Sequence, residues 1–263
     1  MPAPTSFAVV LSHAELAYLL TLFAAAPTVG VDHDPLSALD DASRTVAYAT
    51  ARDALRARDL LRFDAADQPL VQDDLLRVLE SYARPHLVVT AYRYGAGEEL
   101  PLAWFGYRRA GAAVIHTRPG DHLHAFALAA DNAALAQALA DFCADGAAPT
   151  AHGARLTLPA GALAAARAYA DAGQATEDAP VLRSAGLDDD TAAALGADLN
   201  NPAAVTAITF VAPGGDAASR RRDAIYWQST TPSARLIVYT GTEAVQISSG
   251  ADSELLAILN EMV

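Results

Sequence analysis

Three histidines and an aspartate lie close together near the middle of the chain, and side chains of these types can bind a metal ion. They are His116, Asp121, His122 and His124. Zinc takes imidazole nitrogens and carboxylate oxygens as ligands. Because side chains two residues apart in a strand share a face, we expect His122 and His124 on one side of a strand and His116 on the strand before it. The solvent-facing side of an amphipathic strand produces the same alternation, so the pattern leaves both interpretations open.

A second group of this kind, Asp32, His33 and Asp34, stands just before Pro35. A calcium-binding loop needs a longer series of oxygen ligands and a glycine at its turn, and this segment lacks that spacing. Aspartate commonly caps a following helix. We therefore expect turn or cap residues here.

The sequence carries no signature of a reactive nucleophile. It has no Gly-x-Ser-x-Gly motif, and its serines, histidines and acidic residues have no spacing typical of a hydrolase. All 18 basic residues are arginine, which excludes Schiff-base lysines and the lysine of a phosphate-binding loop. Cys143, the single cysteine, is expected to be a buried thiol near a helix end. These observations favour a binding protein without a cofactor over an enzyme.

The composition indicates a globular protein with a substantial core. The chain has 263 residues, of which 52% are hydrophobic, and this length fits one large domain or two fused subdomains. The net charge of −13 disfavours nucleic acid as a partner, because phosphate contacts need clustered Arg or Lys. The apolar run near the N-terminus lacks a basic leader and is too short to span a bilayer. We therefore expect a cytoplasmic protein without membrane insertion.

Hydrophobic periodicity predicts the elements that hold these residues. In the first half, apolar residues recur at helical spacing in three segments and then alternate at strand spacing. Ser12 and Glu15 form a capping box at the start of the first helix, Val46 is expected to face inward from the second, and Pro85 ends the third. The predicted order is a strand at 6–11, a helix after it, helices at 43–62 and 73–84, four antiparallel strands between 86 and 128, and a helix at 131–142.

The second half of the chain repeats this order with a shortened helical block. Leu11 and Leu16 match Leu158 and Leu163. Later in the chain Pro85 matches Pro202, and these two prolines are fewer residues apart than Leu11 and Leu158. The closing helices carry the same apolar stripe, in which Leu135, Ala138, Leu139 and Phe142 match Leu255, Ile258, Leu259 and Met262. The duplication predicts an α+β fold of two pseudo-symmetric halves, residues 1–145 and 155–263. Each half is expected to be an antiparallel sheet with flanking helices, and the two to share a central sheet.

Two glycine-containing loops occupy matching places in the two halves, at residues 95–99 and 212–216. Each joins consecutive strands, whereas the glycine-rich turn of a dinucleotide site opens a helix after a strand. The first loop is acidic and the second is followed by three arginines. Both tryptophans lie on the adjoining strands, where aromatic side chains serve either as core or as anchors for a partner. The aromatic residues are Trp104, Phe105, Tyr226 and Trp227.

Four segments in this order carry a family resemblance: VVLSHAELAYLL, DLLRVLESYARPHLVVTAYRY, LTLPAGALAAARAY and the C-terminal RLIVYTGTEAVQISSGADSELLAILNEMV. Together they resemble the EspG family of type VII secretion-associated chaperones, and the resemblance spans nearly the whole chain. It implies a cytoplasmic chaperone that binds the helical tip of a secreted protein, PE/PPE-like or WXG-like, and keeps this substrate soluble for export. No cofactor is implied.

The resemblance also implies a binding surface formed by the central sheet and its neighbouring loops. A helical tip would dock there through an apolar centre with a polar rim. In this chain the surface corresponds to Arg93, Glu98, Glu99, Leu100, Arg220, Arg221 and Arg222. Two alternatives remain. One is a small-molecule- or metal-binding protein, or an enzyme, that uses His116, His122 and His124. The other is a duplicated scaffold that works by forming a homodimer.

Overall fold

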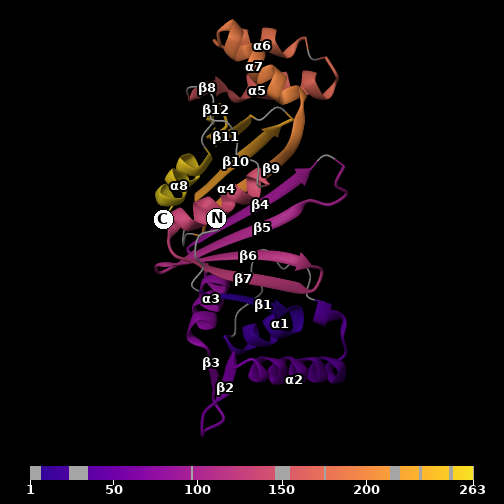
Figure 1. The fold of residues 1–263 in the computed structure, drawn as a ribbon, viewed down its shortest axis with the longest axis vertical. Helices are drawn as coiled ribbons and strands as arrows, with labels where there is room; N and C mark the ends of the chain where they lie inside the picture. The colour runs from indigo at the N-terminus through magenta and orange to yellow at the C-terminus, as the bar shows by residue number, and fades with distance from the viewer. Residues whose placement is uncertain are drawn as a thin grey trace.

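A computed structural model of the protein describes residues 7–23, 35–95, 97–145, 155–174, 176–213, 220–230, 233–248 and 251–262 (Figure 1). The helices are α1 (His13–Leu22), α2 (Asp41–Ala57), α3 (Asp73–Ala83), α4 (Asn132–Ala144), α5 (Ala160–Asp171), α6 (Asp178–Ser184), α7 (Asp189–Asn200) and α8 (Ala251–Glu261), with a short 3-10 helix at Pro35–Ala38. The strands are β1 (Ala8–Ser12), β2 (Leu61–Phe63), β3 (Pro69–Val71), β4 (Leu87–Gly95), β5 (Leu102–Arg109), β6 (Ala112–Gly120), β7 (Leu123–Ala129), β8 (Leu156–Pro159), β9 (Pro202–Ala212), β10 (Arg220–Ser229), β11 (Ala234–Thr240) and β12 (Ala244–Ser248).

One ten-stranded sheet runs through both halves in the order β1-β7-β6-β5-β4-β9-β10-β11-β12-β8. This order reads the same from either edge, since β1, β7, β6, β5 and β4 of the first copy correspond to β8, β12, β11, β10 and β9 of the second. The copies meet where β4 pairs with β9 in antiparallel register, with Ala91 opposite Ile208 near the centre. The predicted α+β fold, with pseudo-symmetric halves that share a central sheet, is confirmed.

Helices cover the sheet unequally on its two faces. On one face α4 and α8 lie side by side across both halves, and Leu135, Leu139, Leu255 and Leu259 of the predicted apolar stripe are buried there. On the other face, α1 and α3 cover the first half and the bundle of α5, α6 and α7 covers the second. Figure 1 shows these two helical groups at opposite ends of the long axis of the molecule. Between them, no helix of the described residues covers this face of the central strands.

The start of α1 shows how the sequence fixes local structure. The Ser12 hydroxyl accepts a hydrogen bond from the backbone N–H of Glu15, and the Glu15 carboxylate accepts one from the N–H of Ser12. The predicted capping box is confirmed. Glu15 also forms an ion pair with Arg58 at 3.0 Å, and the same guanidinium donates to the carbonyl of Val10 on the edge strand β1. Arg58 thereby occupies part of an edge that could otherwise pair with another strand.

The prediction for the second helix was wrong in its end and in its inward face. The helix ends at Ala57, because Asp59 adopts a left-handed backbone conformation with φ of 55°, and Leu61 already belongs to the β2–β3 hairpin. Val46 is 66% exposed instead of buried. The helix packs on α1 through a narrow stripe around Ala51 and Leu55. The spacing of its apolar residues alone therefore predicted the wrong inward face. The predicted cap or turn residues Asp32, His33 and Asp34 lie outside the described residues.

Helix α6 was not predicted, and its contact with α7 requires a glycine. A Cβ added to Gly196 of α7 would lie 2.9 Å from the Oδ2 of Asp178, a buried carboxylate at the start of α6. Asp178 is held by the backbone N–H of Ala179 and by the amide of Asn200, so it has little freedom to withdraw. The two helices therefore approach each other closely only because residue 196 lacks a side chain.

Replacing Gly196 with alanine is expected to destabilise the protein by about 1–3 kcal/mol, the usual cost of overpacking. Urea denaturation would measure the change. Gly161→Ala in α5 is the matched control, since a Cβ there meets no atom within 4 Å. That control should be neutral or stabilising by up to about 1 kcal/mol, because alanine favours a helix over glycine. Equal effects of the two substitutions would rule out the steric explanation.

Among the described residues, no helix combines the length and the apolar character needed to cross a membrane.

Candidate binding site on the central sheet

The centre of the sheet has one covered face and one open face. On the face toward α4 and α8, the side chains of β4 and β9 are buried, among them Leu87, Val89, Ala91, Ile208 and Phe210. The alternate residues point to the other face, and there the central positions are half-buried or exposed. We call this surface the open strip; it consists of Thr90, Tyr92, Tyr94, Ala103, Val205, Ala207, Thr209, Val211, Arg221, Asp223 and Ile225.

The register of the strands orders the open strip into rows. Tyr94 lies opposite Val205, Tyr92 opposite Ala207, and Thr90 opposite Thr209. Tyr94 is 53% exposed and Ala207 is also exposed. Aromatic, small and apolar side chains, which no helix of the described residues covers, thus form a continuous surface between the two helical groups. Such a surface is suited to receive an apolar element of another protein.

Charged residues gather at one end of the open strip. Thr209 donates a hydrogen bond to the carboxylate of Asp223 at 2.8 Å, and Arg221 forms an ion pair with Asp223 at 3.0 Å. Arg221 lies opposite Val211 of β9, which in turn lies opposite Val88 near the start of β4. Tyr94 is near the end of β4, so it is far from these charges. The open strip therefore has an aromatic end and a charged end, and an occupant with matching ends would bind in one direction only.

Buried aromatic residues bound the open strip on both sides. On the side of the first half, Phe105 lies beside Tyr92 with the rings edge to face at 6.1 Å, beneath the layer of α1 and α3. On the side of the second half, Trp227 lies opposite Val205, and the Arg167 guanidinium stacks over its ring at 4.4 Å. The indole and the guanidinium together fix α5 against the sheet, where a cation–π contact is favourable.

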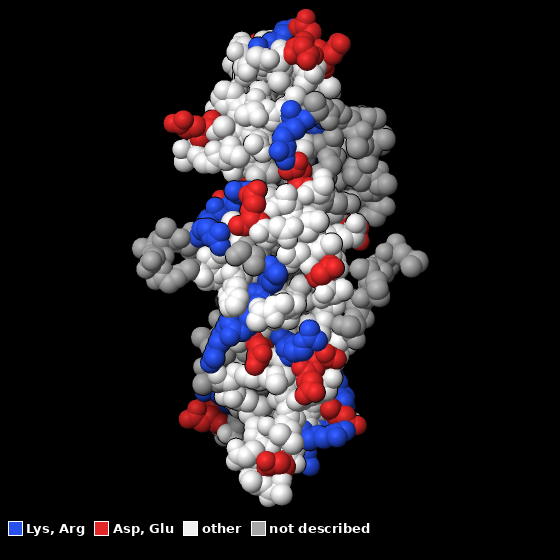
Figure 2. Space-filling model, turned by 90° about the vertical axis from the view of Figure 1, so that its left-hand side faces the viewer, with Lys and Arg blue, Asp and Glu red and all other residues white. Residues whose placement is uncertain are grey.

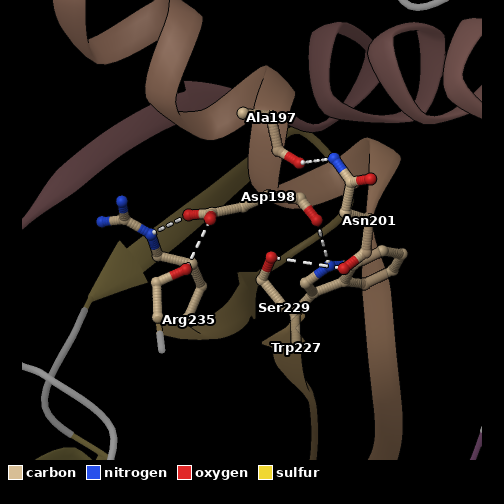
Figure 3. A network of polar contacts seen from close by, with 7 residues as sticks. Ala197, Asp198, Asn201, Trp227, Ser229 and Arg235 are labelled. Atoms are coloured by element: carbon tan, nitrogen blue, oxygen red, sulfur yellow. Dashed lines mark hydrogen bonds and ion pairs between the residues drawn. The ribbon is translucent and has the colours of Figure 1, made fainter. Parts of the chain in front are cut away.

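A polar network fixes α7 to the sheet on the same side (Figure 3). The carboxylate of Asp198 accepts hydrogen bonds from Arg235 Nε at 3.0 Å and from the Ser233 hydroxyl, while its backbone carbonyl accepts from Trp227 Nε1 at 2.8 Å. The hydroxyl of Ser229 donates to the carbonyl of Asn201, just beyond the end of the helix. Because Asp198 and Arg235 are both largely buried, the wall beside the open strip is held in one position.

The residues predicted to face a partner lie at opposite ends of the central strands β4 and β9. The loop with Glu98, Glu99 and Leu100 follows β4, next to the start of β9, whereas Arg220, Arg221 and Arg222 begin β10 next to the end of β9. The two loops are equivalent in the duplication, and the antiparallel pairing of the copies separates them. Only Arg221 belongs to the open strip; Leu100, which is 79% exposed, and the exposed Glu99 lie near its aromatic end.

The other predicted residues have intramolecular partners. Arg93 is 6% exposed and forms an ion pair at 2.9 Å with Asp145, which follows α4. Glu98 folds back to accept a hydrogen bond from the N–H of Gly95. Arg220 donates to the carbonyls of Glu261 and Met262, and Arg222 pairs with the Glu261 carboxylate. These contacts stabilise the helices α4 and α8, so the arginines face the covered side of the sheet.

The histidines do not form the candidate ligand set. His122 lies exposed in the turn between β6 and β7, and its place beside His124 is taken by His13 of α1. The side chains of His13, His124 and His116 form a hydrogen-bonded row that ends at the hydroxyl of Tyr107. Their nitrogens bond to each other and do not point to a common centre. Among the described residues, no group of three or more potential ligands could hold a metal ion.

Two other expectations concerned buried residues. Cys143 is buried in α4, where burial raises the pKa of its thiol to about 12; the thiol is therefore protonated near neutral pH, as expected for a structural cysteine. The four aromatic residues Trp104, Phe105, Tyr226 and Trp227 are all buried. They are core, not exposed anchors.

Sequence reasoning missed the residues that do form the open strip, Tyr92, Tyr94, Val205 and Ala207 above all. The strands that carry them were predicted, but their outer face could not be recognised without knowing that β4 and β9 pair. The available signal was the internal duplication, since equivalent strands at the join of two halves are natural neighbours.

The surface charges are mixed. Figure 2 shows arginines interspersed with aspartates and glutamates over the face that it presents, with no single basic patch among the described residues there. Nucleic-acid-binding surfaces instead cluster Lys and Arg on one face.

The sequence and the fold were compared with known proteins. A family model described as the EspG family matches residues 7–261. None of the curated proteins matches this chain. Among solved structures, the fold is similar to that of EspG5 of Mycobacterium tuberculosis, described as a type VII secretion system chaperone in complex with the PE25–PPE41 dimer. The TM-score is 0.70 at 16% identity, over 95% of this chain and 94% of that chain. Because the family model covers nearly the whole sequence, this protein belongs to the EspG family.

Proposed function

We propose that this protein is a cytoplasmic chaperone of a type VII secretion system, which binds the helical tip of a secreted PE/PPE-like protein and keeps it soluble for export. The observation that carries the proposal is membership of the EspG family over residues 7–261. The similarity in fold to a chaperone described in complex with a PE–PPE dimer supports the class of partner. Binding alone accounts for this function, without catalysis.

The dimensions of the open strip support a helical occupant. The strip spans the strands from β5 to β10, three strand spacings of about 4.8 Å each, or roughly 14 Å. An α-helix with its side chains is about 10–12 Å across. One helix therefore fits along the strip between the helical groups, with its apolar face on Tyr92 and Ala207. An amphipathic helix in an apolar groove is a recurring mode of recognition.

The two ends of the open strip predict the direction of the bound helix. Tyr94 offers an aromatic surface at one end, with Leu100 nearby, and Arg221 and Asp223 offer charges at the other. We expect the apolar tip of the substrate to contact the aromatic end. The earlier assignment of Glu99, Leu100 and Arg221 to partner binding is retained within this proposal, as the rim of the site.

Co-expression with a PE–PPE pair encoded beside the same secretion genes tests the function. We expect the chaperone and the pair to elute together in size-exclusion chromatography as one complex with equal amounts of the three chains. An unrelated soluble helical bundle of similar size serves as the control partner. Separate elution of the pair and the chaperone, with the pair still soluble, would contradict the proposal. Light scattering of the isolated protein would test the homodimer alternative independently.

A further inference from the structure

A buried row of three histidines and a tyrosine lies under the helical layer of the first half. His13 Nδ1 is 3.2 Å from His124 Nε2, His124 Nδ1 is 3.0 Å from His116 Nε2, and His116 Nδ1 is 3.2 Å from the Tyr107 hydroxyl. All four side chains are buried. His116 also stacks on Phe126 with 4.5 Å between ring centroids. We call this arrangement the histidine row.

Neutral rings are sufficient to make every contact of the histidine row. A neutral imidazole has one N–H donor and one acceptor nitrogen, whereas a protonated ring has two donors. With the Tyr107 hydroxyl donating to His116, each ring can accept at Nδ1 and donate at Nε2, so that every contact is satisfied. A proton added to His116 or His124 instead places a positive charge among buried, mostly aromatic side chains. The row therefore needs no charged ring, and burial disfavours protonation of these two rings while the layer is closed.

The second half of the molecule shows that the fold does not need these histidines. His13 begins α1 and donates its N–H to the carbonyl of His122; Ala160 begins α5 and donates in the same way to Glu243. In the sheet, Leu11 lies opposite His124, and its counterpart Leu158 lies opposite Val245. The pairing of the neighbouring strands shows further that Ile237 is the counterpart of His116, and Trp227 the counterpart of Tyr107. The equivalent positions form an apolar core.

The surroundings of the row disfavour charge. Burial is the main cause that lowers the pKa of His116 to about 3 and that of His124 to about 4. The remaining causes act in the same direction, since the neighbouring histidines and Arg118 at the end of β6 repel an added proton. Facing groups on other elements are Tyr82 of α3, which meets His116 edge to face, and Tyr107 and Phe105 of β5.

The carboxylates of this region are engaged elsewhere or exposed. Glu15 of α1 pairs with Arg58, whose guanidinium also bonds to β1. Asp121 lies exposed in the turn beside His122. In the described part of the chain, neither carboxylate contacts His116 or His124. A proton on His116 or His124 would therefore gain no compensation from these two carboxylates, and opening of the layer would relieve this cost.

We propose that the histidine row is an acid-sensitive latch: in mildly acidic solution, the helical layer formed by α1 and α3 loosens from the sheet while the layer of the second half stays in place. The sign follows from linkage. His116 and His124 are neutral in the closed form but bind protons at their ordinary pKa of about 6.5 when the layer opens. Stability of the closed layer is thus complete above that pH and falls as the pH drops toward 4.

Hydrogen exchange measured by mass spectrometry at pH 7.5 and 5.5, corrected for intrinsic exchange rates, tests the latch. Each of the two histidines should raise the opening constant about tenfold over this interval, hence about a hundredfold together. The backbone amides of α1 and α3 should lose protection by this factor. Those of α5 and α7 are an internal control and should change far less. An equal loss in both halves would overturn the proposal.

Variants that copy the second half provide the matched test. His116→Ile with His124→Val should remove the difference between pH 7.5 and 5.5 in α1 and α3. His122→Gln, in the exposed turn, should leave the hundredfold change intact. If the double variant fails to fold, His124→Gln keeps a donor and an acceptor but removes one titrating group, and the change should shrink to about tenfold. A hundredfold change that persists in His124→Gln or in the double variant would refute the latch.

Discussion

Replacing Tyr94 with aspartate is expected to weaken binding of the PE–PPE partner at least thirtyfold, the equivalent of about 2 kcal/mol. Tyr94 is 53% exposed at the aromatic end of the open strip. A carboxylate there would have to lose its hydration against the apolar face of the docked helix without a compensating hydrogen bond. Ala207→Glu, in the adjoining row, should have a similar effect, because it adds both bulk and charge where the helix lies closest to the sheet. Titration calorimetry with the purified pair would give both dissociation constants.

The control for this experiment is Leu70→Asp. Leu70 is also 53% exposed, but it lies on β3, in the separate two-stranded hairpin. Its replacement introduces the same charge at the same exposure, away from the open strip, and should leave the affinity within twofold. Thermal unfolding should show that all three variants are folded, because surface substitutions usually change stability by less than about 0.5 kcal/mol. Wild-type affinity in both strip variants, or a comparable loss in Leu70→Asp, would place the binding site elsewhere.

The sequence predicted the parts of this fold that depend on local signals and on repetition. The capping box of Ser12 and Glu15 was recognisable because its residues are three positions apart. The match between Leu11 and Leu158 predicted two equivalent halves, and both residues do lie on edge strands at opposite ends of the sheet. The apolar stripes of the last helix in each half likewise predicted which sides of α4 and α8 pack on the sheet.

The candidate site depended on contacts between distant residues, which the sequence does not display. The spacing of His116, His122 and His124 suggested a ligand set, but the actual neighbour is His13, 111 residues before His124. Likewise, Arg93 and Arg221 are both charged residues near loops, yet one is buried against Asp145 and the other lies on the open strip. The alternation of side chains along a strand shows which residues share a face, but it does not show which of the two faces is buried. Which face stays uncovered is decided by where the helices pack.

A second large effect is expected from Asp198→Ala, which should destabilise the protein by about 3–5 kcal/mol. Asp198 is the carboxylate that pairs with Arg235 between α7 and β11, and the side chains are 8% and 13% exposed, respectively. Removing one partner of a buried pair leaves the other charge without compensation. The hydroxyl of Ser233 would lose an acceptor as well. Urea denaturation would give the free energy of unfolding, and hydrogen exchange should show the largest loss of protection in α7.

Two further variants distinguish loss of the ion pair from general damage to the core. Asp53→Ala removes the carboxylate of an exposed ion pair with Arg52, and its cost should stay below about 1 kcal/mol, as for most surface pairs. Adding Arg235→Met to Asp198→Ala removes the guanidinium that has lost Asp198 but keeps an apolar side chain in its place. The double variant should therefore be more stable than Asp198→Ala alone. If it is less stable, the guanidinium contributes through its other contacts, and the wall of the open strip is held by more than this pair.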